Sequence, residues 1–269
     1  MTLVDAAEIK LDYARSGEGS EPLLLIMGMS GTALHWGEPF LELLRRDFDV
    51  IAYDHRGVGA SSQLDGPVTI RQMADDAAAL LAALDLDSAH VMGISMGGMI
   101  AQELALNYPG QIRTLTLGCT YCGGPGSSLG PPEVMRGLAE AMMSGDRERA
   151  IRAGWEANVS PETAADEQAY ARFRQIALSR AVAVPVVMEQ LRACIAHDTY
   201  ERLPELASLP TLVIHGTVDR MLPVQNGHLI ASRIAGSRLE ILDGIGHMFF
   251  CERPERSAEL VREHAAVPA

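Results

Sequence analysis

Residues 91–100 place a single serine between two glycines, with apolar residues on either side. The apolar residues before Gly93 are typical of a buried strand, and those after Gly97 are typical of a buried helix. Glycine at both positions removes side chains that would collide where the chain turns back sharply. Ser95 lies between the two glycines. The segment therefore predicts a strand, a tight turn and a helix, with the serine hydroxyl exposed at the turn.

The same Gly-x-Ser-x-Gly spacing occurs a second time, over residues 126–130 around Ser128. This second copy follows a glycine-rich segment and runs into Pro131 and Pro132. It has no apolar strand before it and no helix directly after it. We therefore expect Ser128 to lie in a loop and Ser95 to be the functional serine.

Strand-like apolar segments alternate with helix-like segments from residue 23 to residue 122, and again after residue 203. This alternation predicts an α/β fold with a mostly parallel, twisted sheet flanked by helices. Between residues 123 and 203 the pattern is helical only, with helices expected over 133–143, 147–158, 161–181 and 185–197. We expect residues 1–122 and 204–269 to form the core domain, and residues 123–203 to form a helical cap inserted after the sixth strand.

The composition restricts the partners and the compartment. The formal net charge is −13 and the isoelectric point is near 5.0, which argues against nucleic acid and anionic membrane as partners. No apolar run is long enough to span a membrane, and the first residues do not resemble a signal peptide. We therefore expect a cytoplasmic protein that binds a small molecule, with the oligomeric state left open.

The cysteines do not indicate a metal or redox site. Four cysteines are too few and too scattered for a disulfide framework. Cys119 and Cys122 have C-x-x-C spacing, but they run into a glycine-rich loop instead of starting a helix. We expect no metal and no cofactor.

A serine hydroxyl needs a base to become a nucleophile, usually a histidine oriented by a carboxylate. In open α/β sheets both should lie beyond the carboxyl ends of strands. Among eight histidines, His247 is in the loop directly after the last predicted strand. His215 ends a strand inside an apolar run, so we expect it to be packed in the core or to support the site. His247 is therefore the predicted base.

The carboxylate has two candidates. Asp219 lies in the loop after the predicted strand over residues 211–215, whereas Asp243 is only four residues before His247 on the same loop. We favour Asp219, although its position before a predicted helix would also suit a helix cap. The predicted catalytic residues are thus Ser95, Asp219 and His247.

Acyl transfer also needs two backbone N–H groups that bind the developing oxyanion. One should belong to Met96, the residue after the nucleophile. The other should come from the loop after the predicted strand over residues 23–27, where we assign Met29. Only the main chain acts in this role, so a methionine side chain is no obstacle.

These segments together resemble the α/β-hydrolase superfamily over nearly the whole chain. The resemblance is carried by residues 27–31, 53–61, 93–98, 216–219 and 246–247. Residues 26–28 and 53–57 are most similar to the enol-lactonase, carboxylesterase and aromatic-polyketide methylesterase group. Many relatives have histidine where this chain has Met27, so this loop says less about the substrate. The chain order serine, aspartate, histidine is the order of this superfamily.

Thirteen methionines are present, and several flank the predicted site. They suggest an apolar, adaptable pocket under the cap. The residues expected to line it are Met27, Gly28, Met99, Trp155 and Met248. A pocket of this kind favours a hydrophobic ester or lactone over a sugar, phosphate or peptide.

The sequence thus predicts a serine hydrolase that cleaves a carboxylic ester or lactone of a hydrophobic small molecule through an acyl-enzyme on Ser95. Three alternatives stay open. The same triad could hydrolyse a carbon–carbon bond of a diketo or dienoic acid, which should require a basic residue near the pocket. It could act as a cofactor-free haloperoxidase or perhydrolase. The fold could also serve a non-catalytic small-molecule receptor.

Overall fold

The computed structural model describes residues 1–267. Within this range eight strands form one sheet, in the order β1-β2-β4-β3-β5-β6-β7-β8. β1 pairs with β2 and β2 with β4 in antiparallel fashion, and all other neighbours are parallel. The mostly parallel α/β fold predicted from the sequence is confirmed. The strands are β1 (Thr2–Ala6), β2 (Ile9–Ser16), β3 (Glu21–Ile26), β4 (Phe48–Tyr53), β5 (Ala89–Ile94), β6 (Ile112–Gly118), β7 (Thr211–Gly216) and β8 (Arg238–Leu242).

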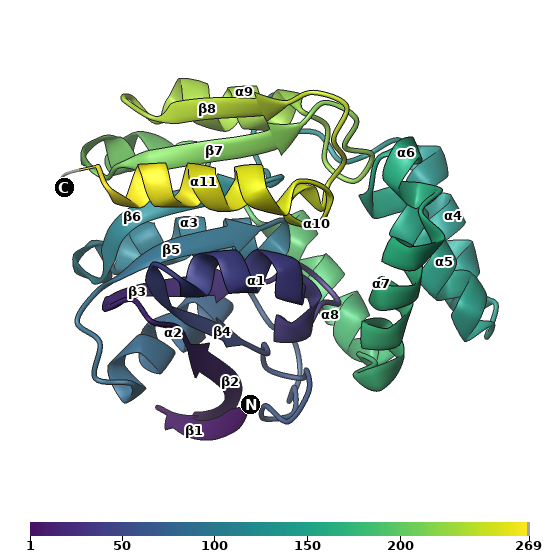
Figure 1. The fold of residues 1–269 in the computed structure, drawn as a ribbon, viewed down its shortest axis with the longest axis horizontal. Coiled ribbons are helices and arrows are strands. Elements are labelled where there is room, and N and C mark those ends of the chain that lie inside the picture. Colours follow the sequence, from purple (N-terminus) through teal and green to yellow (C-terminus); the bar gives the residue numbers. More distant parts are fainter. Residues whose placement is uncertain (268–269) are drawn as a thin grey trace.

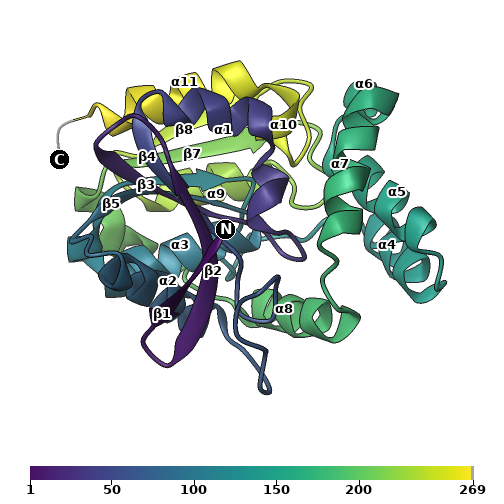
Figure 2. The same ribbon diagram turned by 60° about the horizontal axis from the view of Figure 1, so that its bottom comes forward.

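Strand β3 shows why the central strands are largely apolar. Leu24 and Ile26 pack into one hydrophobic cluster, whereas Leu23 and Leu25 pack into another on the opposite face. α2 (Ile70–Ala83), α3 (Met96–Asn107) and α9 (Gln225–Arg233) contribute to the first cluster, and α1 (Glu38–Arg45) and α11 (Pro254–Ala265) to the second. Figure 2 shows these two helical layers on either side of the sheet. A strand covered on both faces has no solvent-facing side, which favours apolar residues at successive positions.

The helices between β6 and β7 form the cap that the sequence predicts after the sixth strand. Figure 1 shows α4 to α7 beyond the ends of the strand arrows, separate from the two layers on the sheet. The α-helices between β6 and β7 are α4 (Pro132–Met143), α5 (Arg147–Asn158), α6 (Pro161–Ala164), α7 (Glu167–Ser179) and α8 (Val184–Ala196). The division of the chain into domains at residues 122/123 and 203/204 stays a prediction.

One predicted cap helix is wrong. The sequence predicts a single helix over residues 161–181, but the structure has α6 and α7 with a break at Asp166. The Asp166 carboxylate accepts hydrogen bonds from the backbone N–H groups of Gln168 and Ala169, at 2.8 and 3.1 Å. It therefore caps the start of a new helix, and its side chain competes with helix continuation at that point.

Short helical segments complete the connections. They are the 3₁₀ turns η1 (Ala33–Trp36), η2 (Pro109–Gln111) and η3 (Leu203–Ser208), and the helix α10 (Phe249–Glu252). None of the helices formed by residues 1–267 combines the length and the apolar character that crossing a membrane requires.

Candidate active site

Ser95 lies in the sharp turn between β5 and α3, as the sequence predicts. Its backbone φ is +57°, a left-handed value that is strained for a residue with a side chain. A Cβ atom at Gly93 would lie 2.1 Å from the Gly97 carbonyl oxygen, and one at Gly97 would lie 2.0 Å from the Ile26 carbonyl oxygen. Both positions therefore require glycine, because this close approach of backbone to backbone forms the turn.

The neighbouring strand β6 holds this turn in place. The Ser95 N–H donates to the Gly118 carbonyl oxygen at 2.9 Å. The Thr120 hydroxyl donates to the Ser95 carbonyl oxygen at 2.7 Å. Thr120 was missed at the sequence level, since nothing local marks it as a partner of a residue 25 positions earlier.

Ser128 lies in the connection between β6 and α4, outside any helix or strand, as predicted. Its backbone N–H donates to the Asn226 side-chain oxygen at 3.0 Å. The surroundings of Ser128 thus lack the strand and helix that present Ser95.

Asp219 and His247 are brought together by the pairing of β7 with β8. Backbone hydrogen bonds continue beyond the two strands, from Thr217 N–H to the Leu242 oxygen and from Val218 N–H to the Ile245 oxygen. The two loops that follow therefore run side by side. Asp219 Oδ2 lies 2.7 Å from His247 Nδ1, and both side chains are buried.

The second oxygen of Asp219 organises its own loop. Oδ1 accepts hydrogen bonds from the N–H groups of Met221 and Leu222 at 2.8 and 2.9 Å. α9 begins only at Gln225, so Asp219 is not a helix cap. The competing residue Asp243 is exposed and accepts a hydrogen bond from the Thr217 hydroxyl at 3.2 Å. The geometry thus pairs His247 with Asp219.

The electrostatics keep Asp219 ionised. Burial by itself would raise the pKa of Asp219, but the charge on His247 and the hydrogen bonds from His215 and His247 outweigh it and lower the pKa below its ordinary value. An ionised Asp219 accepts the Nδ1–H of His247, which leaves His247 Nε2 free to take a proton. The pair has the chemistry of a histidine base with its orienting carboxylate.

His215 is buried beneath this pair, where the sequence places it in the core or in a supporting role. Its Nε2 lies 2.7 Å from the Leu222 carbonyl oxygen and 3.3 Å from Asp219 Oδ2. Cys119, His215 and Asp219 lie close enough together to be considered as metal ligands. However, both Asp219 oxygens already have partners, and burial raises the pKa of the Cys119 thiol well above its ordinary value. This set therefore suits internal hydrogen bonding better than a metal.

Ser95 and His247 follow the carboxyl ends of β5 and β8, at the same edge of the sheet, and β6 and β7 lie between these two strands. Between their strands lies Cys119, whose thiol donates to the Gly246 carbonyl oxygen at 3.8 Å. Within residues 1–267, Ser95 Oγ and His247 Nε2 do not form a direct hydrogen bond. Hydrogen bonds of this kind often tighten only when substrate binds. The serine–histidine contact stays a prediction.

The two predicted oxyanion donors border the serine. A Cβ atom at Gly28 would lie 3.1 Å from the Ser95 Cβ and 3.7 Å from its Oγ, so the loop after β3 passes directly over the serine. Met29 follows Gly28, and Met96 is the first residue of α3. The first N–H groups of a helix have no acceptor within it. The role of the Met29 and Met96 N–H groups as oxyanion donors stays a prediction.

The loop that carries His247 is tied to the cap by Glu252, another residue that the sequence analysis missed. Glu252 Oε1 accepts a hydrogen bond from Gly246 N–H at 2.8 Å. Its Oε2 accepts from Ser160 N–H at 3.1 Å and from the Thr163 hydroxyl at 2.8 Å. The sequence holds no signal for this link, because Ser160 and Thr163 lie about ninety residues away from Glu252.

The predicted pocket residues divide between the two faces. Met27, Trp155 and Met248 belong to the hydrophobic cluster that includes α1 and α11, whereas Met99 belongs to the cluster around α2 and α3. Gly28 lies against Ser95. The structure thus brings Met27, Trp155 and Met248 into one cluster and leaves Met99 apart from them. The binding role of all five residues stays a prediction.

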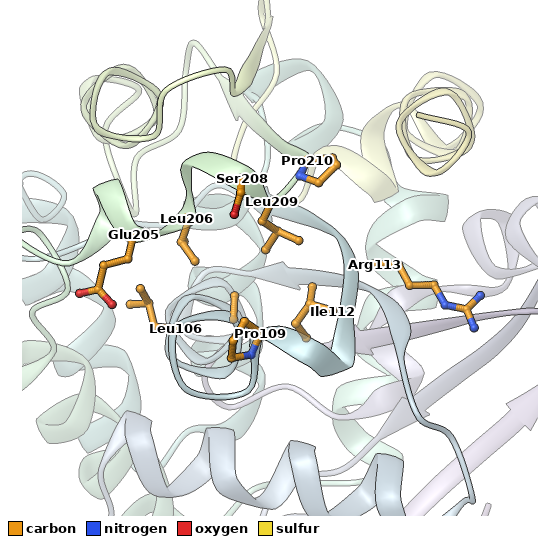
Figure 3. Close-up of a pocket in the computed structure, with 10 residues that line it drawn as sticks. Leu106, Pro109, Ile112, Arg113, Glu205, Leu206, Ser208, Leu209 and Pro210 are labelled. Carbon is orange, nitrogen blue, oxygen red and sulfur yellow. The ribbon is translucent and has the colours of Figure 1, made fainter. Parts of the chain in front are cut away.

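A cavity of about 300 Å³ lies far from this site. Figure 3 shows its walls, in which Ile112 and Arg113 come from the start of β6 and Pro210 directly precedes β7. The amino ends of β6 and β7 therefore border this cavity, whereas Ser95 and Asp219 follow the carboxyl ends of their strands. Ligands of open α/β sheets bind at the carboxyl ends, so this cavity is not the candidate active site.

Known proteins are similar to this chain in sequence and in fold. A family model described as the alpha/beta hydrolase fold matches residues 21–254. A putative carbamate hydrolase of Azorhizobium caulinodans is 29% identical over 262 residues, with 97% of each chain covered. The 3-oxoadipate enol-lactonase 2 of Acinetobacter baylyi is 28% identical over 258 residues, covering 93% of this chain and 91% of that protein.

Among solved structures, a hydrolase from Pseudomonas aeruginosa superposes with a TM-score of 0.84 at 30% identity, with 98% of each chain covered. The resemblance to the superfamily that the sequence motifs carry is confirmed by these matches, an enol-lactonase among them. The chain belongs to the α/β-hydrolase family.

Proposed function

We propose that this protein is a serine hydrolase that cleaves a carboxylic ester or lactone of a hydrophobic small molecule through an acyl-enzyme on Ser95. The observation that carries the proposal is the buried pair of Asp219 Oδ2 and His247 Nδ1, 2.7 Å apart, at the edge of the sheet where the strained turn carries Ser95. An ionised carboxylate that orients a histidine, at the same edge of the sheet as a half-buried serine, provides the groups of an acyl-transfer site. The hydrolase relatives support the same reaction class.

In the proposed reaction, Ser95 Oγ attacks the substrate carbonyl carbon while His247 Nε2 takes the hydroxyl proton. The Met29 and Met96 N–H groups bind the oxyanion, and each would lower the barrier by about 3 kcal/mol. The tetrahedral intermediate then expels the alkoxide, which receives the proton from His247. Water attacks the acyl-enzyme with His247 as base and releases the carboxylic acid. With a lactone, the alkoxide stays attached to the acyl group.

The type of bond cleaved distinguishes ester hydrolysis from the hydrolysis of related substrates such as carbamates. A carbamate carbonyl would be attacked by the same serine and histidine. Because a putative carbamate hydrolase matches over 97% of both chains, a carbamate should be included among the substrates tested. The apolar cluster of Met27, Trp155 and Met248 favours hydrophobic acyl or alcohol groups.

A cytoplasmic location also stays a prediction from the sequence.

The decisive experiment combines labelling with turnover. A fluorophosphonate probe should label wild-type protein at Ser95, identified by peptide mass spectrometry. A series of p-nitrophenyl esters of increasing acyl length, two aliphatic lactones and a phenyl carbamate should then rank the substrate classes. We expect esters or lactones with medium acyl chains to be turned over fastest. Labelling at a different serine, or no turnover of any member of the series, would contradict the proposal.

A further inference from the structure

We propose that Gln190 of α8 is a positioning residue for the loop that supplies the Met29 N–H. We call residues 28–31 the oxyanion loop. This inference rests on the proposed function, because it assigns the loop a role in binding the oxyanion. It adds a cap residue to the site, so that the cap takes part in transition-state stabilisation as well as covering the site.

The contact that carries the inference joins two distant parts of the chain. The backbone N–H of Ser30 donates to Gln190 Oε1 at 2.9 Å across 160 residues. Gln190 is only 1% exposed. Ser30 has φ of +60°, a left-handed value that a residue with a side chain adopts only when its surroundings hold it there. Gln190 is thus a buried acceptor for the N–H of Ser30, a strained residue that directly follows Met29.

The peptide planes explain how this contact reaches the Met29 N–H. Peptide units are planar, so the N–H of Met29 points away from the carbonyl oxygen of Gly28. Gly31 N–H donates to that oxygen at 3.3 Å, which orients the plane before Met29. Gln190 orients the next plane through Ser30 N–H. With both planes held, the Met29 N–H keeps a fixed direction.

The other half of the Gln190 amide makes no hydrogen bond within residues 1–267, so the role of this residue rests on Oε1. Its Nε2 is buried and has no hydrogen-bond partner among the described residues. A buried polar group left unpaired costs about 1–3 kcal/mol of stability. Methionine has a similar length and would remove this cost. The benefit of glutamine therefore lies in the Oε1 contact with the oxyanion loop.

A second cap residue reaches the chain just beyond this loop, which supports the same arrangement. Arg180, at the end of α7, donates to Asp54 Oδ2 at 2.9 Å. Asp54 Oδ1 accepts a hydrogen bond from Ala33 N–H at 2.7 Å. The cap thus holds the segment after β3 at Ser30 directly and at Ala33 through Asp54. Displacement of the cap would loosen both ends of this segment.

The test compares Gln190→Met with Gln190→Glu and with Gln111→Met. Glutamate keeps an oxygen acceptor for Ser30 N–H, whereas methionine removes it. Gln111 is a matched control, because it also has an unpaired buried amide atom but lies at the end of η2, before the amino end of β6 and away from the site. Thermal melting and the hydrolysis of p-nitrophenyl butyrate are measured for all three variants and for wild type.

We expect Gln190→Met to lower kcat by about tenfold with KM changed by less than about twofold, since a misdirected donor loses part of its effect on the transition state. Its melting temperature should stay close to that of wild type, because the loss of the acceptor for Ser30 N–H offsets the removal of the unpaired Nε2. Gln190→Glu should recover kcat to within about threefold of wild type, and Gln111→Met should leave kcat unchanged. A wild-type kcat in Gln190→Met, or no recovery in Gln190→Glu, would overturn the proposal.

Hydrogen exchange separates this inference from the proposed function. The Ser30 amide should be protected in wild type and should exchange at least about tenfold faster in Gln190→Met, whatever the substrate proves to be. If wild type hydrolyses no ester or lactone but the exchange result holds, the proposed function is wrong, while the role of Gln190 in holding Ser30 is supported. An unprotected Ser30 amide in wild type would contradict the role of Gln190, and this result does not depend on whether the methionine variant folds.

Discussion

His215 Nε2 lies 3.3 Å from Asp219 Oδ2, the same oxygen that faces His247 Nδ1. One carboxylate oxygen is therefore in contact with two imidazoles. His215 also lies 2.7 Å from the Leu222 carbonyl oxygen, so it links the Asp219 side chain to the far end of its loop. Its side chain has no exposed surface. His215 thus holds the Asp219 carboxylate on one side, and His247 contacts the same oxygen.

Replacing His215 by leucine should misplace Asp219 without removing any reacting group. We expect kcat to fall by about 10- to 100-fold, because small displacements of a catalytic group are expensive. KM should change by less than about twofold. The measurement is steady-state hydrolysis of a p-nitrophenyl ester, with circular dichroism to verify folding. His228→Leu is the control, since His228 is exposed on α9. Equal losses in both variants would refute the role of His215.

Ser95→Ala should lower kcat by about a millionfold, because removing the nucleophile of a triad abolishes the acyl-enzyme route. Ser128→Ala should stay within about threefold of wild type, since Ser128 lies in a loop without the turn geometry of Ser95. The comparison uses kcat and fluorophosphonate labelling of both variants. Similar losses of kcat in the two variants would show that Ser95 is not the nucleophile.

Asp219→Asn tests both activity and acid stability. We expect kcat to fall about ten-thousandfold, since an amide cannot hold His247 in the tautomer that accepts a proton from serine. The folded-state pKa of Asp219 lies below its ordinary value of 3.8. A carboxylate with a lowered pKa stabilises the folded state above about pH 4, and this contribution is lost as the pH falls toward the folded-state pKa.

The difference in melting temperature between wild type and Asp219→Asn should therefore be largest near neutral pH. It should narrow as the pH is lowered from about 5 to about 2. Thermal melts in buffers of constant ionic strength measure it. A difference that stays constant over this range would show that the charge of Asp219 does not contribute to stability.

Gly97→Ala should destabilise the fold, because the added Cβ would lie 2.0 Å from the Ile26 carbonyl oxygen. We expect a loss of about 1–3 kcal/mol or more, typical of overpacking. Gly154→Ala is the matched control. Position 154 lies within α5 and has open space around it, so alanine should add about 0.5–1 kcal/mol through helix propensity. Urea denaturation measures both, and a tolerated Gly97→Ala would contradict the close packing of the turn.

Arg180→Gln should weaken the link between the cap and the core. Arg180 pairs with Asp12 and Asp54 at 2.8 and 2.9 Å, and both carboxylates are buried. Breaking a fully buried pair costs about 3–5 kcal/mol, and the partial exposure of Arg180 reduces the expected loss to about 1–3 kcal/mol. Arg192→Gln should change stability by less than about 0.5 kcal/mol, because its pair with Glu189 is exposed on the arginine side. Comparable losses in the two variants would rule out a specific role for Arg180.

The sequence determined the features that depend on neighbouring residues. Gly93 and Gly97 around Ser95 predict the strand, turn and helix, because no other residue fits where backbone approaches backbone. The apolar runs predict strands buried on both faces, and their alternation with helices predicts the parallel sheet. Loops after parallel strands share one edge of the sheet, so Asp219 and His247 could be chosen as candidates from the sequence.

The tertiary structure alone decided the links between distant segments. The pairing of β7 with β8 sets the 2.7 Å contact of Asp219 with His247, and the placement of the cap brings Gln190 to Ser30 and Ser160 to Glu252. A single polar residue in a helix or loop carries no sign of its partner 90 or 160 residues away. Such contacts depend on how whole elements pack, and local patterns record only the conformation and burial of their own segment.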